Sequence, residues 1–111
     1  MREEKSEFLK GTLDMLILKV VALGPIHGYA IAQRIQQISW DFFKLQQGSN
    51  YPALYRVEDR GWLRAEWRAS DTGREANFYA LTPMGRKQLD AEVRSWEQLT
   101  DTVALILGTA E

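Results

Sequence analysis

Few side chains in this sequence have the chemistry of catalysis or of metal binding. The 111 residues include no cysteine and a single histidine, His27. This composition excludes disulfide scaffolds, zinc fingers, iron–sulfur sites and cysteine nucleophiles. No carboxylates are paired as general acid and base catalysis requires, and the sequence contains no glycine-rich phosphate loop. We therefore expect a protein that is not an enzyme and uses no cofactor or metal, with His27 as a loop or cap residue.

The charged side chains are distributed unevenly along the chain, although the net charge is only −1. Residues 30–87 carry nine basic and six acidic side chains, a charge of +3. Residues 88–111 carry one basic and five acidic side chains, a charge of −4. Phosphate binding depends on the local potential rather than on the total charge, so a basic middle segment is compatible with nucleic acid. A solvated surface with random charge placement fits the same excess.

Hydrophobic spacing predicts three helices in the first half of the chain. The first begins at Thr12 as N-cap, has Asp14 in its first turn and ends at Gly24-Pro25; the second runs from Gly28 to Ile38; the third is capped by Ser49, has Pro52 in its first turn and ends near Gly61. Residues 40–48, between the second and third helices, fit either a short strand or a packed loop.

The second half of the chain begins with the alternation of apolar and polar residues that is typical of the strands of a β-hairpin. Leu63, Ala65 and Trp67 alternate with charged residues and are expected to face inward. Thr82 and Pro83 then mark the N-cap and first position of a last helix that extends to about Leu107. This helix is roughly 36 Å long, too long to pack only against so small a domain. The order predicts an α+β winged helix-turn-helix over residues 1–82 and a C-terminal dimerisation helix over residues 83–111.

Three segments of the chain have a familiar pattern: GTLDMLILKVVALGPIHGYAIAQRI, QQGSNYPALYRVEDRGWLRAEW and NFYALTPMGRKQL. Together they resemble the PadR family of bacterial transcriptional regulators, and the resemblance extends from about Leu9 to Leu89. Asn50 departs from the family, which usually has an apolar residue at this position. The resemblance implies a homodimer that binds double-stranded operator DNA and usually represses transcription. It also implies release from DNA by a small molecule, often phenolic or planar, in some members.

The third helix is the predicted recognition helix. Leu54 and Val57 share a face that is expected to pack inward, whereas the far side is expected to carry Ser49, Pro52, Ala53, Arg56 and Asp59 or Arg60. A helix N-terminus with an arginine one turn on suits a phosphate and a guanine edge, and an amide suits adenine. The alternatives are a capped surface helix for this segment, a polar residue at a half-exposed position for Asn50, and plain solvent exposure for Lys44. The predicted DNA contacts are Tyr29, Lys44, Ser49, Asn50, Pro52, Tyr55, Arg56 and, at the hairpin tip, Arg74, with Tyr51 expected in the core.

The last helix carries an apolar stripe that one domain cannot cover. Its 4-3-3-4-3 spacing is broadly that of a coiled-coil seam, and large exposed apolar patches are rare on monomers. Trp96, midway along the stripe, is expected to anchor a dimer core, with the wall of a ligand pocket as the alternative. The predicted dimerisation or effector residues are Leu16 of the first helix and Leu89, Val93, Trp96, Leu99, Val103 and Ile106.

Together these features predict a DNA-binding transcriptional regulator, most simply a repressor released by a small molecule. A cytoplasmic location without membrane association is expected, since the first residues lack the apolar stretch of a signal peptide and no apolar segment is long enough to span a bilayer. The alternative is a winged-helix protein–protein adaptor that does not bind DNA. The near-neutral charge and the acidic residues Asp71 and Glu75 beside Arg74 favour that alternative.

Overall fold

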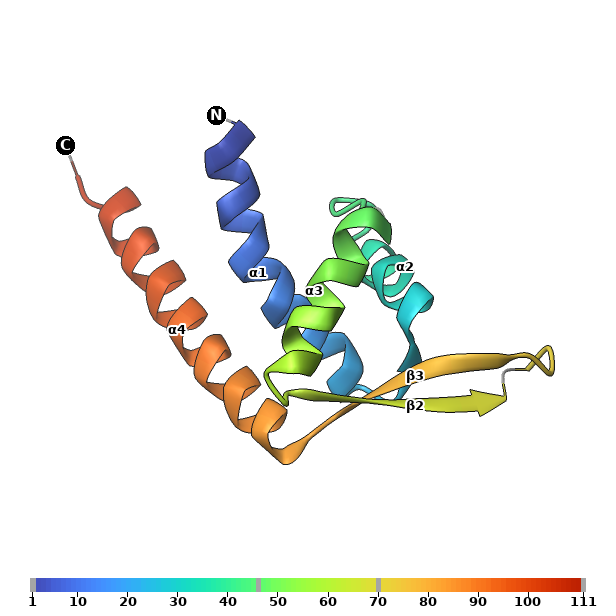
Figure 1. The fold of residues 1–111 in the computed structure, drawn as a ribbon. Helices are drawn as coiled ribbons and strands as arrows, with labels where there is room; N and C mark the ends of the chain where they lie inside the picture. Colours follow the sequence, from blue (N-terminus) through green and yellow to red (C-terminus); the bar gives the residue numbers. More distant parts are fainter. Residues whose placement is uncertain (1, 46, 70, 111) are drawn as a thin grey trace.

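The computed structural model describes residues 2–45, 47–69 and 71–110 of the chain. Within these residues the elements are α1 (Arg2–Ala22), β1 (Ile26–His27), α2 (Gly28–Ile38), α3 (Gln47–Asp59), β2 (Leu63–Ala69), β3 (Glu75–Leu81) and α4 (Pro83–Leu107) (Figure 1). The order confirms the predicted winged helix-turn-helix followed by a long helix. The two-residue strand β1 is the one element that the sequence did not predict, because it is too short to show a period.

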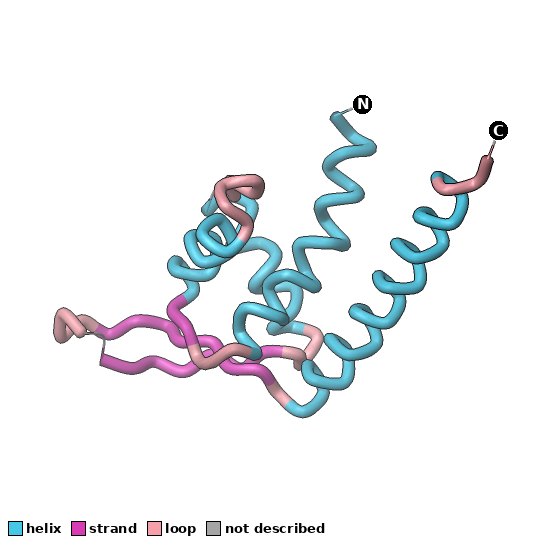
Figure 2. Tube along the Cα trace, turned by 180° about the vertical axis from the view of Figure 1, so that it is seen from behind, coloured by secondary structure: helices cyan, strands magenta, loops and turns pink. Residues whose placement is uncertain are grey.

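The strands form one antiparallel sheet in the order β1-β3-β2. The β2–β3 register runs from Leu63 opposite Leu81 to Ala69 opposite Glu75, and the sheet lies beneath the helices as a separate layer (Figure 2). The outer half of the hairpin extends past the helices, so Trp67 is 69% exposed. The expectation that Trp67 faces inward was therefore wrong, because the strand is longer than the core beneath it.

The core lies where the second half of α1, the helices α2 and α3, the sheet and the start of α4 meet. Its fully buried large side chains are Ile17, Leu18, Ile31, Leu54, Val57, Tyr79 and one polar residue, Asn50. Gly28 opens α2 directly against this core, and a Cβ atom there would lie 2.9 Å from the ring of Tyr79. The close approach of α2 to β3 therefore depends on a residue without a side chain.

Two helix starts differ from the prediction. α1 begins at Arg2 rather than at Thr12, so Thr12 is not an N-cap and Asp14 lies in mid-helix. Residues 2–10 are mostly charged residues with good helix propensity, which an apolar spacing does not detect. α3 begins at Gln47, which places Ser49 within the first turn rather than at the cap and Pro52 inside the helix.

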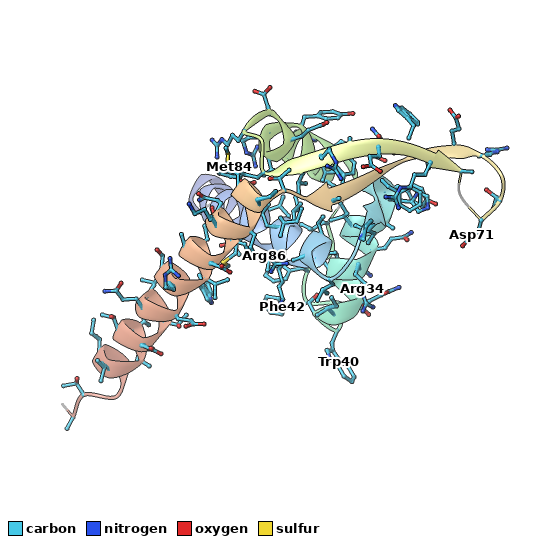
Figure 3. The ribbon with its side chains drawn as sticks, turned by 90° about the horizontal axis from the view of Figure 1, so that it is seen from below. Arg34, Trp40, Phe42, Asp71, Met84 and Arg86 are labelled. Atoms are coloured by element: carbon cyan, nitrogen blue, oxygen red, sulfur yellow. The ribbon has the colours of Figure 1, made fainter. Side chains whose placement is uncertain are left out.

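Residues 39–45, which follow α2, form a packed loop rather than a strand. Trp40 and Asp41 adopt positive φ angles of 53° and 65°. The partly buried side chains of Phe43 and Leu45 pack against the core. Trp40 and Phe42 project into solvent instead (Figure 3).

α4 begins and ends where the sequence predicted. The hydroxyl of Thr82 accepts a hydrogen bond from the Gly85 amide at 2.9 Å, which is the predicted N-cap. α4 packs against α1 near its own start, and the two helices then diverge toward the chain ends (Figure 1). The molecule is accordingly elongated, with extents of 61, 28 and 23 Å. Among the described residues no helix has the length and apolar character needed to cross a membrane.

Candidate nucleic-acid interface

α3 has a fully covered inner face and an open outer face. Leu54 and Val57 are buried, as predicted, while Pro52 and Tyr55 are exposed on the opposite side. Ala53 was expected on the outer face but is buried. It is one turn from Val57 and therefore shares the inner side of the helix.

Asn50 lies in the core, which agrees neither with the predicted contact to adenine nor with its alternative, a polar residue at a half-exposed position. Its side chain is 0% exposed, and its Nδ2 donates a hydrogen bond of 3.0 Å to the backbone oxygen of Gly28. A buried amide needs such partners, because burying an unsatisfied polar group is unfavourable. Asn50 thus ties the first part of α3 to the start of α2 and cannot reach a base.

Arg56 does not project from the outer face either. Its Nε donates to Asp14 Oδ2 at 3.2 Å, and a second guanidinium nitrogen lies 2.5 Å from Asp14 Oδ1. The hydrogen bond to Asp14 raises the pKa of Arg56 above its ordinary value. Both side chains are partly or largely buried. The expected guanine contact is therefore replaced by a two-point ion pair between α3 and α1.

The tyrosines separate as predicted. Tyr51 is half-buried and packs against the core, whereas Tyr55 and Tyr29 are 59% and 49% exposed. Tyr29 stacks on His27 with ring centroids 5.0 Å apart, and His27 stands at the N-cap of α2, in keeping with the predicted loop or cap role. Lys44 is exposed just before α3.

The remaining predicted contacts lie at the hairpin tip and at the start of α3. Arg74 is exposed beside Gly73, whose φ of 83° turns the chain. Asp71 is also exposed, at the end of the hairpin farthest from Met84 and the start of α4 (Figure 3). The side chain of Ser49 lies outside the described residues, so its contact stays a prediction.

β2 carries a small charge cluster that the alternation of its residues does not reveal. Arg64 and Arg68 each place a guanidinium nitrogen 3.0 Å from a carboxylate oxygen of Glu66. The hydrogen bond from Arg68 and the positive charges of both arginines lower the pKa of Glu66. These two arginines therefore share their charge with a carboxylate on the same strand.

α1 and α4 enclose two shallow hollows, one on each side of their contact. One has a volume of about 450 Å³ and the other of about 500 Å³, and both are lined by Met15 and Trp96. Leu16, half-buried, lines the second hollow. The predicted residues Leu16 and Trp96 thus line the same hollow, between α1 and α4.

The apolar stripe of α4 is covered only at its start. Leu89 is buried and Val93 packs against the core. Beyond Trp96, the stripe residues Leu99, Val103 and Ile106 are 51%, 43% and 68% exposed. The chain itself thus leaves the second half of the stripe open.

Comparison with known proteins decides the family. The model of the transcriptional regulator PadR-like family matches residues 17–91, which contain α2, α3, the sheet and the first part of α4. The chain belongs to this family. PadR-like proteins are transcriptional regulators rather than enzymes, in agreement with the expected absence of catalysis.

Individual relatives and solved structures match most of the chain. The transcriptional regulator Rv3488 of Mycobacterium tuberculosis is 34% identical over 97 residues, 87% of each chain. The crystal structure of a PadR-like transcriptional regulator from Bacillus cereus superimposes with a TM-score of 0.83 at 27% identity, covering 94% of this chain and 99% of the other. An uncharacterised 37.1 kDa protein of a Streptomyces fradiae transposon is 40% identical over 90 residues, which are 81% of this chain and 24% of the other.

Proposed function

We propose that this PadR-like regulator binds operator DNA as a homodimer and represses transcription until a small molecule releases it. In this proposal residues 1–82 form the DNA-binding domain and residues 83–111 the dimerisation helix. The observation that carries the proposal is the division of α3 into a covered inner face and an open outer face with Pro52 and Tyr55. A helix buried on one side and open on the other can enter a major groove without unfolding the core.

The proposed contacts lie on this outer face and on other exposed segments of the chain. Tyr55 lies on it, Tyr29 at the start of α2, Lys44 just before α3, and Arg74 at the hairpin tip. Hydroxyl and basic groups of this kind bind phosphate oxygens and fix the register of a protein on the duplex. Arg74 is suited to the minor groove, where a narrow groove attracts arginine. Such a protein acts where the chromosome is, and a cytoplasmic location follows as part of the proposal.

The homodimer is supported by the open half of the α4 stripe. Leu99, Val103 and Ile106 expose apolar surface along one face of a helix that has left its own domain. Two copies of a helix of this kind bury the stripe by pairing about a two-fold axis. A two-fold dimer also presents two recognition helices to DNA, which successive major grooves accept when the half-sites are about one helical turn apart.

The release step is supported by the hollows between α1 and α4. Volumes of about 450 and 500 Å³ lie within the range of small-molecule sites, roughly 300–1,000 Å³. The lining combines Met15 and the indole of Trp96 with the polar side chains of Gln88 and Glu92. A flat aromatic or phenolic molecule fits this chemistry, since it stacks on an indole and bonds to a few polar groups.

The test is fluorescence anisotropy with a labelled duplex that the protein itself selects from a random pool. We expect tighter binding to the selected duplex than to a scrambled duplex, and a logarithm of affinity that falls linearly with the logarithm of salt concentration. The slope is about −0.9 for each phosphate neutralised. An adaptor that does not bind DNA would yield no enriched sequence and no salt-dependent retention on either duplex.

A further inference from the structure

We propose that Asp14 and Arg56 form a positioning pair for DNA recognition. Their ion pair fixes the orientation of α3 relative to α1, and Arg56 affects DNA binding through that orientation without touching DNA. The inference rests on the proposed DNA-binding function. It assigns to two residues a role that neither their positions in the sequence nor their charges indicate.

The geometry of the ion pair is suited to fixing the orientation of α3 relative to α1. Two guanidinium nitrogens of Arg56 meet two different oxygens of Asp14, at 3.2 and 2.5 Å. Two-point pairing of this kind fixes direction as well as distance, because the planar guanidinium matches the planar carboxylate. The Asp14 side chain is 11% exposed and that of Arg56 27% exposed, so water competes little for either group.

A second directional contact, a hydrogen bond, also holds α3 in its orientation. Asn50 bonds to Gly28 of α2, six residues before Arg56, which is about 9 Å along the helix axis. The apolar contacts of Ala53 and Leu54 lie between these two points, and apolar contacts by themselves do not specify a direction. Two directional contacts to two different helices therefore define both the rotation and the tilt of α3. Tyr55, which follows Leu54 in the sequence, lies on the outer face, so its position depends on both polar contacts.

A two-point contact of Arg56 with a base through the same edge of its guanidinium would require the pair to break. The carboxylate of Asp14, largely covered by its surroundings, would then lose its counter-charge, and an unpaired buried charge is strongly unfavourable. The pair also reaches α1, on which Leu16, a predicted dimerisation or effector residue, follows Asp14 by two positions. The orientation of each recognition helix is in this way tied to the dimer.

The decisive experiment compares two removals of one negative charge. Asp14→Asn weakens the ion pair, whereas Asp59→Asn removes an exposed carboxylate from the same recognition helix and serves as the matched control. Affinities are measured by anisotropy for the self-selected duplex and for a scrambled duplex. We expect Asp14→Asn to lower affinity for the selected duplex by about 5- to 150-fold, the equivalent of one misplaced base contact, and to leave the scrambled duplex unchanged. Asp59→Asn is expected to leave both affinities equal or slightly higher.

The opposite result would overturn the proposal. If Arg56 touches DNA, Asp14→Asn frees its charge and raises affinity as Asp59→Asn does. Wild-type protein that fails to select or bind any duplex would contradict the proposed function itself, which keeps the two failures distinct.

A charge exchange keeps the proposal testable if Asp14→Asn does not fold. Arg56→Asp alone is expected to abolish selective binding, and Asp14→Arg combined with Arg56→Asp is expected to restore at least part of it by re-forming the pair in reverse. A directly contacting arginine would not be replaced by an aspartate, so an exchange variant as weak as Arg56→Asp, with an unchanged melting temperature, contradicts the proposal.

The slope of log affinity against log salt distinguishes a positioning role from a phosphate contact, because loss of a positioning residue leaves that slope unchanged. Arg56→Gln is expected to lower affinity for the selected duplex with an unchanged slope of log affinity against log salt. A slope smaller in magnitude by about one would mean a lost phosphate contact and would also contradict the proposal.

Discussion

α3 and the outer half of α4 are both helices with one apolar face, but the chain covers only one of these faces. The inner face of α3, with Ala53, Leu54 and Val57, is at most 1% exposed. On the outer half of the α4 stripe, Val103 is 43% exposed and Ile106 is 68% exposed. The inner face of α3 is therefore covered within a single chain, whereas α4 is covered only near its start, where it packs against α1 and the core.

This difference in coverage means that the orientations of α3 and of the outer half of α4 are determined in different ways. The orientation of α3 is set by groups of the chain itself, including the directional contacts of Asn50 and Arg56. The outer half of α4 has no comparable contact in the described residues and is long enough to reach a second subunit. Changes in α3 should accordingly act on DNA binding within one subunit, and changes in α4 on assembly.

The largest effect is expected from charging the open half of the stripe. In Val103→Asp combined with Ile106→Asp, each lost side chain is worth about 1.5 kcal/mol or more of apolar burial. Because a two-fold dimer contains each change twice, we expect dimerisation to weaken by about 6 kcal/mol or more. The monomer should stay folded, since both positions are exposed within one chain. Sedimentation velocity measures the dimer, and circular dichroism measures the fold.

The control adds the same two charges beside the stripe. Gln98→Asp with Thr102→Asp changes two exposed polar positions on α4 and should leave the dimer intact. If this control dissociates the dimer as fully as the stripe variant, general repulsion rather than loss of the stripe explains the effect. An undisturbed dimer in the stripe variant would mean that the outer half of α4 is not the interface.

The second prediction concerns Trp96, which stands where the covered part of the stripe gives way to the open part. As a dimer anchor, Trp96→Ala should weaken the dimer by about 3–5 kcal/mol, the range for truncating a large buried aromatic side chain. Sedimentation equilibrium over a concentration series measures this change. The position of Trp96 between two hollows also fits a ligand wall.

The two roles of Trp96 differ in a second measurement. If Trp96 is a pocket wall, the alanine variant keeps its dimer but loses the quenching of indole emission by added planar aromatic compounds such as 2-naphthol. Trp40, Trp62 and Trp67 also emit, so the quenching of the variant must be subtracted from that of the wild type. A dimer of unchanged stability would show that the anchor interpretation is wrong.

The sequence predicted α4 more accurately than it predicted α3, and the reason is the range of the signals involved. Thr82-Pro83 is a local start signal, and the stripe repeats along one helix, so both can be read without knowing the rest of the fold. The start of α1 was missed because a charged segment has helix propensity but no apolar period. Trp67 was misplaced because alternation does not reveal where a hairpin outgrows its core.

The candidate site shows the same limit. The inward residues Leu54 and Val57 followed from helical spacing alone. Asn50 and Arg56 did not, because their partners Gly28 and Asp14 lie 22 and 42 residues away in the sequence. A polar side chain that pairs across such a separation looks, in the sequence, the same as one that faces solvent. Both wrong predictions, for Asn50 and Arg56, therefore concern the residues that fix the orientation of α3.

The smallest predicted effect concerns Thr82, the joint between the two regions. Its hydroxyl accepts from the Gly85 amide at 2.9 Å and donates to the Gly61 oxygen at 2.6 Å, so one group caps α4 and ties it to the turn after α3. Thr82→Ala removes both bonds and should lower the free energy of unfolding by about 1 kcal/mol, as other N-cap losses do. Thr82→Ser keeps the hydroxyl and should lose only a few tenths of that amount.

This measurement is best made by urea unfolding in the monomeric Val103→Asp, Ile106→Asp background, where assembly does not contribute to stability. Dimerisation of the single variant Thr82→Ala in an otherwise native chain should be unchanged, because the stripe is untouched. A variant that loses the dimer but keeps its unfolding free energy would mean that Thr82 sets the direction of α4 rather than its stability. In that case the joint, and not the stripe alone, would determine how the two subunits meet.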